Sequence, residues 1–405
     1  MQIQVNQSEQ AGAKKLALFN LGFRPFFLGA GIFAVVSIVW WMLVYFFLDT
    51  ISITHITTSQ WHAHEMLYGY GMAVIAGFLL TAVKNWTGIA TLHGKPLMIL
   101  FMLWCAARVL FLFGTALLPW AATADLLFGL MLIFAIAKPI IQARQWKQLA
   151  VVTKVFLLWI GNLVFYLGCY GVLASGMLYA INGAVLLFIS LILMLGRRVI
   201  PFFIERGVAE KVQLKQYIWL DFSILVVFLA LFINSIFAQI PNLTTALAWT
   251  LFALNGYRLC NWHTVGIWRV PLLWSLYLSA WLINIGFLFF GLQAYGLHAQ
   301  HTHLSILTLH IFTVGGIGLM TLGMMSRVAL GHTGRDIRKP SVWMGIAFAG
   351  IVASAVFRAM VPMLTTQFYT SWVLIAAIFW IFSFAVFVVI YAPILLKPRI
   401  DGAYG

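Results

Sequence analysis

The feature that most restricts how this chain can fold is a succession of apolar runs, each about 20 residues long, the length that crosses the hydrocarbon core of a bilayer as a helix. The runs follow one another along nearly the whole sequence. The chain is 63% hydrophobic and only 8% charged, and its mean hydropathy is +1.00, whereas soluble domains carry about a quarter charged residues. A water-soluble fold is therefore excluded, and we predict an all-α polytopic membrane helical bundle.

Apolar windows bounded by Pro, Gly and charged residues predict about twelve transmembrane helices in one membrane domain covering residues 1–405. The first window is too long for a signal peptide and lacks a small-residue cleavage site. The predicted spans lie near 26–48, 65–83, 97–116, 123–142, 154–174, 177–196, 217–238, 243–261, 271–293, 303–325, 341–361 and 370–392.

The positions of the 24 Lys and Arg residues test this number of spans. When the span ends are assigned alternately to two sides, every one except Arg108 and Arg358 falls on the side of the two termini. Basic loops stay in the cytoplasm, so we expect cytoplasmic termini and a multi-pass protein of the bacterial inner (cytoplasmic) membrane. The net charge of +15 is then explained by contact with membrane lipid, and nucleic-acid binding is not expected.

Most of the ten histidines fall on the other, outer side of this topology. Neutral imidazole is a good ligand for haem iron and copper, so this asymmetry predicts a metal or haem site. Residues two apart on a helix point about 200° apart, and residues seven apart share a face at heights about 10.5 Å apart. The haem axial candidates, on the second and tenth spans, are His62, His64, His303 and His310; the metal candidates are these four with His301 and, on the inner side, His332.

Charged residues inside the spans need partners. Arg108 and Arg358 lie in the outer half, where they are expected to pair with haem propionates. Glu65 is a candidate proton carrier or a support for His62, and its alternative is a helix N-terminal acid stabilised by the helix dipole. Asp125 is likewise expected to be a helix N-terminal acid. Isolated histidines at span ends are expected to be interfacial residues.

Several motifs together resemble the NnrS family, membrane proteins associated with haem, copper and bacterial defence against nitric oxide. They lie at residues 21–27, 61–66, 77–88, 309–310 and 331–335. The resemblance implies an inner-membrane protein that contains haem, expected to be b-type, and copper and that relieves nitrosative stress. The matching motif positions are His62, His64, Glu65, His310 and His332, whereas Tyr277 stands where we would expect a histidine.

The twelve-span layout is more distantly similar to the catalytic subunit of haem-copper oxidases. Spans six and seven carry no histidine here, so a binuclear centre of the oxidase type is not expected. The leading hypothesis is a protein that binds or reduces nitric oxide at an outer-side haem, with quinol as the candidate electron donor. The alternative is a secondary transporter of a metal or haem that uses the outer histidines and Glu65 as its substrate site. The sequence leaves open whether nitric oxide is turned over and whether the protein forms a homo-oligomer.

Overall fold

The computed structural model describes residues 16–47, 56–295 and 304–405, which form helices joined by short connections and, within these ranges, no β-strand. The α-helices are α1 (Phe23–Phe47), α2 (Thr58–His64), α3 (Met72–Thr87), α4 (Lys95–Phe111), α5 (Leu118–Gln142), α6 (Leu149–Cys169), α7 (Gly176–Gly207), α8 (Ile218–Ile233), α9 (Pro241–Trp262), α10 (Pro271–Ala294), α11 (Leu304–His310), α12 (Leu319–His332), α13 (Val342–Ala355), α14 (Val361–Leu364) and α15 (Tyr369–Leu396).

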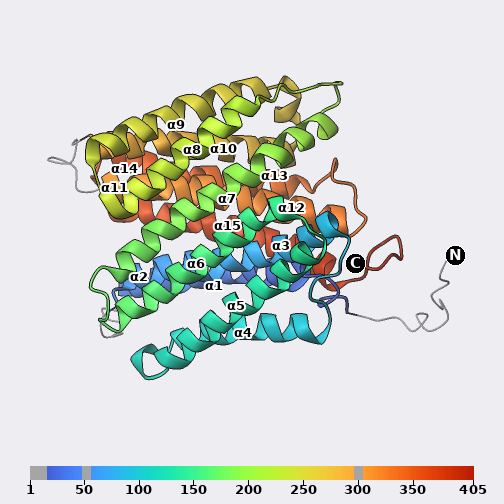
Figure 1. Ribbon diagram of the computed structural model, residues 1–405, viewed down its shortest axis with the longest axis horizontal. Helices are drawn as coiled ribbons and strands as arrows, with labels where there is room; N and C mark the ends of the chain where they lie inside the picture. The colour runs from blue at the N-terminus through green and yellow to red at the C-terminus, as the bar shows by residue number, and fades with distance from the viewer. Residues whose placement is uncertain (1–15, 48–55, 296–303) are drawn as a thin grey trace.

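Four of the continuous helices contain a π-helical turn, which either joins two α-helices end to end or follows the last residue of one. The turns are η2 (Glu65–Gly71) between α2 and α3, η5 (Asn234–Ala238) after α8, η8 (Ile311–Gly318) between α11 and α12, and η9 (Val356–Met360) between α13 and α14. Each continuous run of elements is one rod, and the described ranges contain twelve such rods. They lie side by side in one bundle, in which α1 packs against α15 and α3 (Figure 1). The predicted all-α polytopic bundle is confirmed.

Ten helices of the described ranges are long and apolar enough to cross a membrane by their length and composition. The two other predicted spans, 97–116 and 243–261, correspond to α4, which has 17 residues, and α9, which buries Asn255 and Arg258. Each packs along an apolar neighbour, α5 and α10 respectively. The shorter helix α4 and the more polar helix α9 are therefore each held in the bundle by an apolar neighbour.

The helix that contains the predicted sixth span, 177–196, is longer than that span, since α7 continues to Gly207. The sequence around Arg197 and Arg198 has the composition of a loop, but arginine is a good helix former. Pro201 lies inside the helix and removes one backbone donor without ending it. The basic residues thus extend the helix beyond the apolar run.

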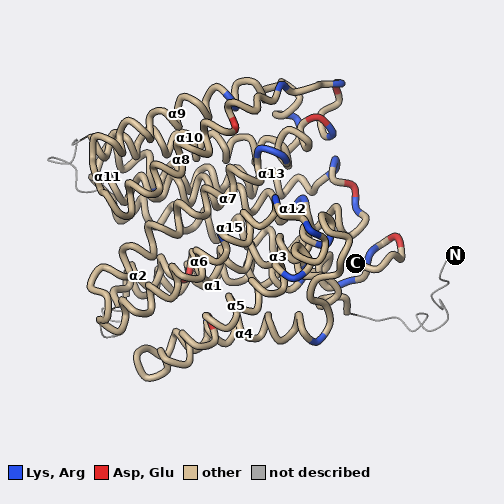
Figure 2. The backbone as a smooth tube through the Cα atoms, in the orientation of Figure 1, with Lys and Arg blue, Asp and Glu red and all other residues tan. Residues whose placement is uncertain are grey.

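Lys and Arg residues concentrate at one end of the bundle, here called the basic end (Figure 2). The start and the finish of the described chain meet at this end, where the Ala17 amide donates to the Leu396 carbonyl at 2.7 Å. Arg24 is fully buried there, and its Nη1 donates to the carbonyls of Leu395 and Lys397 at 2.8 Å each. The first helix therefore satisfies the free carbonyls at the end of the last helix.

Candidate functional site

The rod formed by α2, η2 and α3 separates two polar sites. Its start is fixed by a capping box, in which the Gln60 amide donates to Thr57 Oγ1 at 3.2 Å and the Thr57 amide donates to Gln60 Oε1 at 2.9 Å. Beyond this cap, His62 stacks on Trp41 with ring centroids 4.4 Å apart. His64 is fully buried against Phe165. The two histidines thus belong to different sites.

His62 lines a cavity of about 420 Å³, the histidine cavity, enclosed by α1, α2, α7, α11, α13, α15 and the turns between them. Most of its wall is apolar. The polar or titratable side chains in the wall are Tyr45, Ser59, His62, Tyr70, His310, Thr313, Ser354, Arg358 and Tyr369. Residues from the second, tenth and eleventh predicted spans are therefore brought to one cavity.

Both histidines of this cavity have a ring nitrogen suited to a ligand. The Nδ1 atom of His62 is buried and has no hydrogen-bond partner among the described residues. The Nδ1 atom of His310 lies 2.6 Å from the Ile306 carbonyl, which can only accept, so Nδ1 carries the proton. The Nε2 atom of a neutral His310 ring then keeps its lone pair, as in metal-binding histidines that donate the other N–H to a carbonyl.

Arg358 is the charged group of the histidine cavity, and only 9% of its surface is exposed. Its Nη1 donates to the Tyr369 hydroxyl at 3.1 Å. Among the described residues, no carboxylate lies within ion-pair distance of its guanidinium. A buried cation without an anion is costly, so this side of the cavity favours an anionic group on a ligand.

Arg108 lies in the second site, the carboxylate cluster, defined as His64, Glu65, Arg108 and Asp125. Its Nη1 is 2.5 Å from Glu65 Oε1, and its Nη2 is 2.5 Å from Asp125 Oδ1. All four side chains are buried, and none of them lines the histidine cavity. Arg108 is thus already paired within the protein, and the geometry gives no support to the propionate contact expected of it.

The hydrogen bonds around His64 fix one of its protons. Asn162 Nδ2 donates to Asp125 Oδ2 at 2.9 Å, which directs Asn162 Oδ1 at His64 Nε2, also at 2.9 Å. An amide oxygen only accepts, so Nε2 is protonated. The Nδ1 atom of His64 lies 2.9 Å from Glu65 Oε1, and these two atoms must share a proton because a carboxylate and an unprotonated nitrogen cannot both accept. In this arrangement neither ring nitrogen of His64 is free for a metal.

Asp125 was expected to be a helix-start acid, and this expectation is wrong. It lies in the second turn of α5, where it accepts from Asn162 and, at 3.1 Å, from the Tyr166 hydroxyl as well as pairing with Arg108. The sequence reasoning missed Asn162 and Tyr166 as its partners. The available signal was that an acid within a span needs polar partners on neighbouring helices.

His332 does not line the histidine cavity. His332 ends α12 at the basic end, with its ring 5.7 Å from Phe23 and its carbonyl accepting from Arg399 Nη1 at 3.1 Å. His301 and His303 lie outside the described residues. Within the described part of the chain, no group of three or more His, Cys, Asp or Glu side chains could hold a metal ion.

A π-helical turn adjoins or contains His64, His310 and Arg358. η2 follows His64, η8 follows His310, and Arg358 lies within η9. Such turns are rare and occur often at functional sites. Three of the rods around the histidine cavity thus depart from regular α geometry beside it.

Comparison with known proteins connects this geometry to a family. The model of the NnrS protein family matches residues 17–399, nearly the whole chain. A search among curated proteins finds no match. The matched range includes every described residue of the histidine cavity and of the carboxylate cluster.

Proposed function

The chain belongs to the NnrS family, and on that premise we propose that it is a nitric-oxide-response membrane protein whose histidine cavity holds a haem. The observation that carries the proposal is that His62, His310 and Arg358 line one cavity. His62 offers a ring nitrogen that has no hydrogen-bond partner among the described residues, and His310 offers a ring nitrogen whose lone pair is free. The third is a buried cation without a carboxylate among the described residues.

These three residues fit the groups that a haem presents. His62 and His310 are the candidate axial ligands, with His303 as the candidate outside the described residues, and Arg358 would pair with a propionate. A bound haem would supply an iron that can coordinate nitric oxide. The wall is mainly apolar and would admit a small uncharged gas.

Copper and turnover are further parts of the proposal. A copper site would draw on histidines of the segment that includes His301 and His303. If nitric oxide is reduced there, quinol from the membrane would supply the electrons. We place the protein in the bacterial inner membrane with its basic end in the cytoplasm, as the distribution of Lys and Arg favours.

The test is the absorbance spectrum of the purified protein. We expect a Soret band that shifts on addition of nitric oxide and that is weakened or displaced in His62→Ala and His310→Ala. Arg358→Gln should lower the haem content. The matched controls are His93→Ala and His263→Ala, since neither residue lines the histidine cavity. A colourless protein, or equal effects of all four histidine variants, would refute the proposal.

A further inference from the structure

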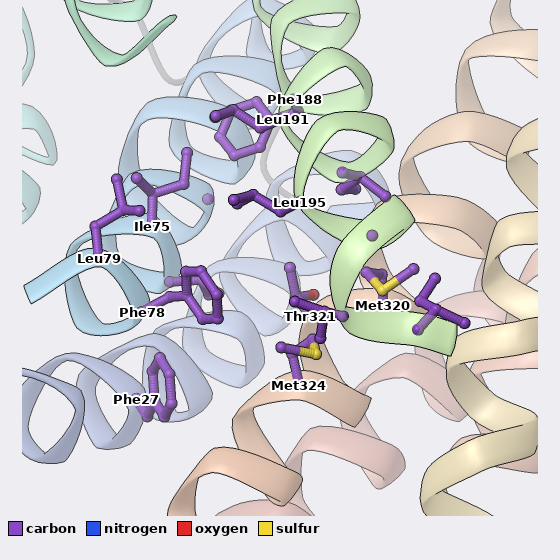
Figure 3. A pocket seen from close by; sticks show the side chains of 16 residues that line it. Phe27, Ile75, Phe78, Leu79, Phe188, Leu191, Leu195, Met320, Thr321 and Met324 are labelled. Atoms are coloured by element: carbon purple, nitrogen blue, oxygen red, sulfur yellow. The ribbon is translucent and has the colours of Figure 1, made fainter. Parts of the chain in front are cut away.

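A second cavity lies next to the histidine cavity and differs from it in chemistry. This apolar crevice, with a volume of about 100 Å³, lies between α3, α7 and α12. Figure 3 shows side chains of the three helices converging on it, among them Ile75, Leu195 and Met320. Thr321 is the one polar side chain in its wall, and no charged side chain lines it.

The Thr321 hydroxyl is already engaged in hydrogen bonds. It donates to the carbonyl of Ile317 at 2.7 Å or of Gly318 at 2.9 Å, and it lies 2.6 Å from the Tyr70 hydroxyl. The crevice therefore offers no free polar side chain to an occupant. A buried water needs two to four polar partners, whereas dry apolar cavities bind benzene or xenon. The wall thus favours an uncharged, apolar occupant.

The same rods line the crevice and the histidine cavity at successive positions. Tyr70 lines the histidine cavity and Gly71 lines the crevice. On α7, Val185 lines the histidine cavity and Phe188 lines the crevice. The hydrogen bond from Tyr70 to Thr321 joins a residue of one cavity to a residue of the other. The two cavities are therefore neighbours, with this pair between them.

We propose that the apolar crevice binds a small uncharged diatomic gas and that the Tyr70–Thr321 pair lies on the path from the crevice to the histidine cavity. A diatomic gas molecule is small enough to pass between the Tyr70 and Thr321 side chains when they move, whereas a lipid acyl chain is too large to pass them. The path rests on the proposed function, because it leads to the haem proposed there. Binding in the crevice does not depend on the haem.

Binding in the crevice is tested with xenon as the probe. A structure of the protein determined under xenon pressure should show xenon beside Val74 and Met320, and Val74→Phe should abolish this site by filling it. Val226→Phe is the matched control, because Val226 is 48% exposed on α8 and does not line the crevice. Xenon that persists in Val74→Phe, an empty crevice, or an acyl chain in its place would overturn the proposal.

The path is tested with carbon monoxide and the reduced protein. After flash photolysis, the second-order rate of carbon monoxide binding should fall about tenfold in Val74→Phe, equivalent to about 1.4 kcal/mol in the barrier, and stay unchanged in Val226→Phe. Equal rates in both variants would overturn the path. A protein without haem would sink the proposed function together with the path, and the xenon result would still decide whether the crevice binds a gas.

Discussion

Two buried arginines with opposite surroundings give the sharpest test of the site geometry. Arg108 is 5% exposed and Arg358 is 9% exposed, so their burial is nearly equal. Arg108 lies 2.5 Å from a carboxylate oxygen of Glu65 and of Asp125. Arg358 donates to a neutral hydroxyl at 3.1 Å and has no carboxylate within reach among the described residues. The test compares the free energies of unfolding of Arg108→Gln and Arg358→Gln in the cofactor-free protein.

The expected magnitudes follow from what each substitution leaves behind. Arg108→Gln removes the cation that lies between Glu65 and Asp125, and breaking a buried ion pair in this way costs about 3–5 kcal/mol. Arg358→Gln loses one hydrogen bond worth about 1.5–3 kcal/mol from a charged donor. It also removes a buried charge that has no carboxylate partner among the described residues, which offsets that loss. Its free energy of unfolding should therefore stay within about 1 kcal/mol of the parent protein.

Reversible unfolding in mixed micelles measures both free energies of unfolding. The cofactor-free protein is used because a bound haem would add its own stabilisation to the folded state. The triple variant Glu65→Gln/Arg108→Gln/Asp125→Asn, which removes all three charges, should be more stable than Arg108→Gln alone. Equal losses for the two arginine variants, or no recovery in the triple variant, would refute the assigned pairings.

Three further substitutions test individual contacts. Gly69→Ala should lower the free energy of unfolding by about 1–3 kcal/mol, because the new Cβ would lie 2.9 Å from Arg108 Nη1. The control in the same unfolding assay is Gly183→Ala, whose new Cβ would have its nearest neighbour at 3.8 Å. Arg24→Leu should speed hydrogen exchange at the end of α15, where its three carbonyl contacts are lost, and unchanged exchange would contradict that capping role. Tyr166→Phe removes one donor to Asp125 and should cost about 0.5–1.5 kcal/mol in unfolding free energy, with no loss counting against the hydrogen bond.

The sequence predicts the number and order of the rods because each long apolar run must cross the bilayer as a helix, and the alternation of basic loops checks their number. It also predicts that His62 and His64 face different ways, since helix geometry is local. The pairing of Arg108 with Glu65 and Asp125 could not be predicted, because it depends on how three different rods pack against one another. The position of Asn162 beside His64 and the different surroundings of Arg108 and Arg358 could not be predicted for the same reason.

The π-helical turns have a consequence for changes in chain length. Each contains about one residue more per turn than an α-helix, and one residue corresponds to a rotation of about 100°. Deleting a single residue within η2 would restore regular α geometry and leave the facing of α3 nearly unchanged, but it would change the directions of the side chains within the turn, which include Tyr70 of the histidine cavity. We therefore expect insertions and deletions to be tolerated in the connections between rods and to be excluded from η2, η8 and η9, where one residue more or less changes which side chains meet.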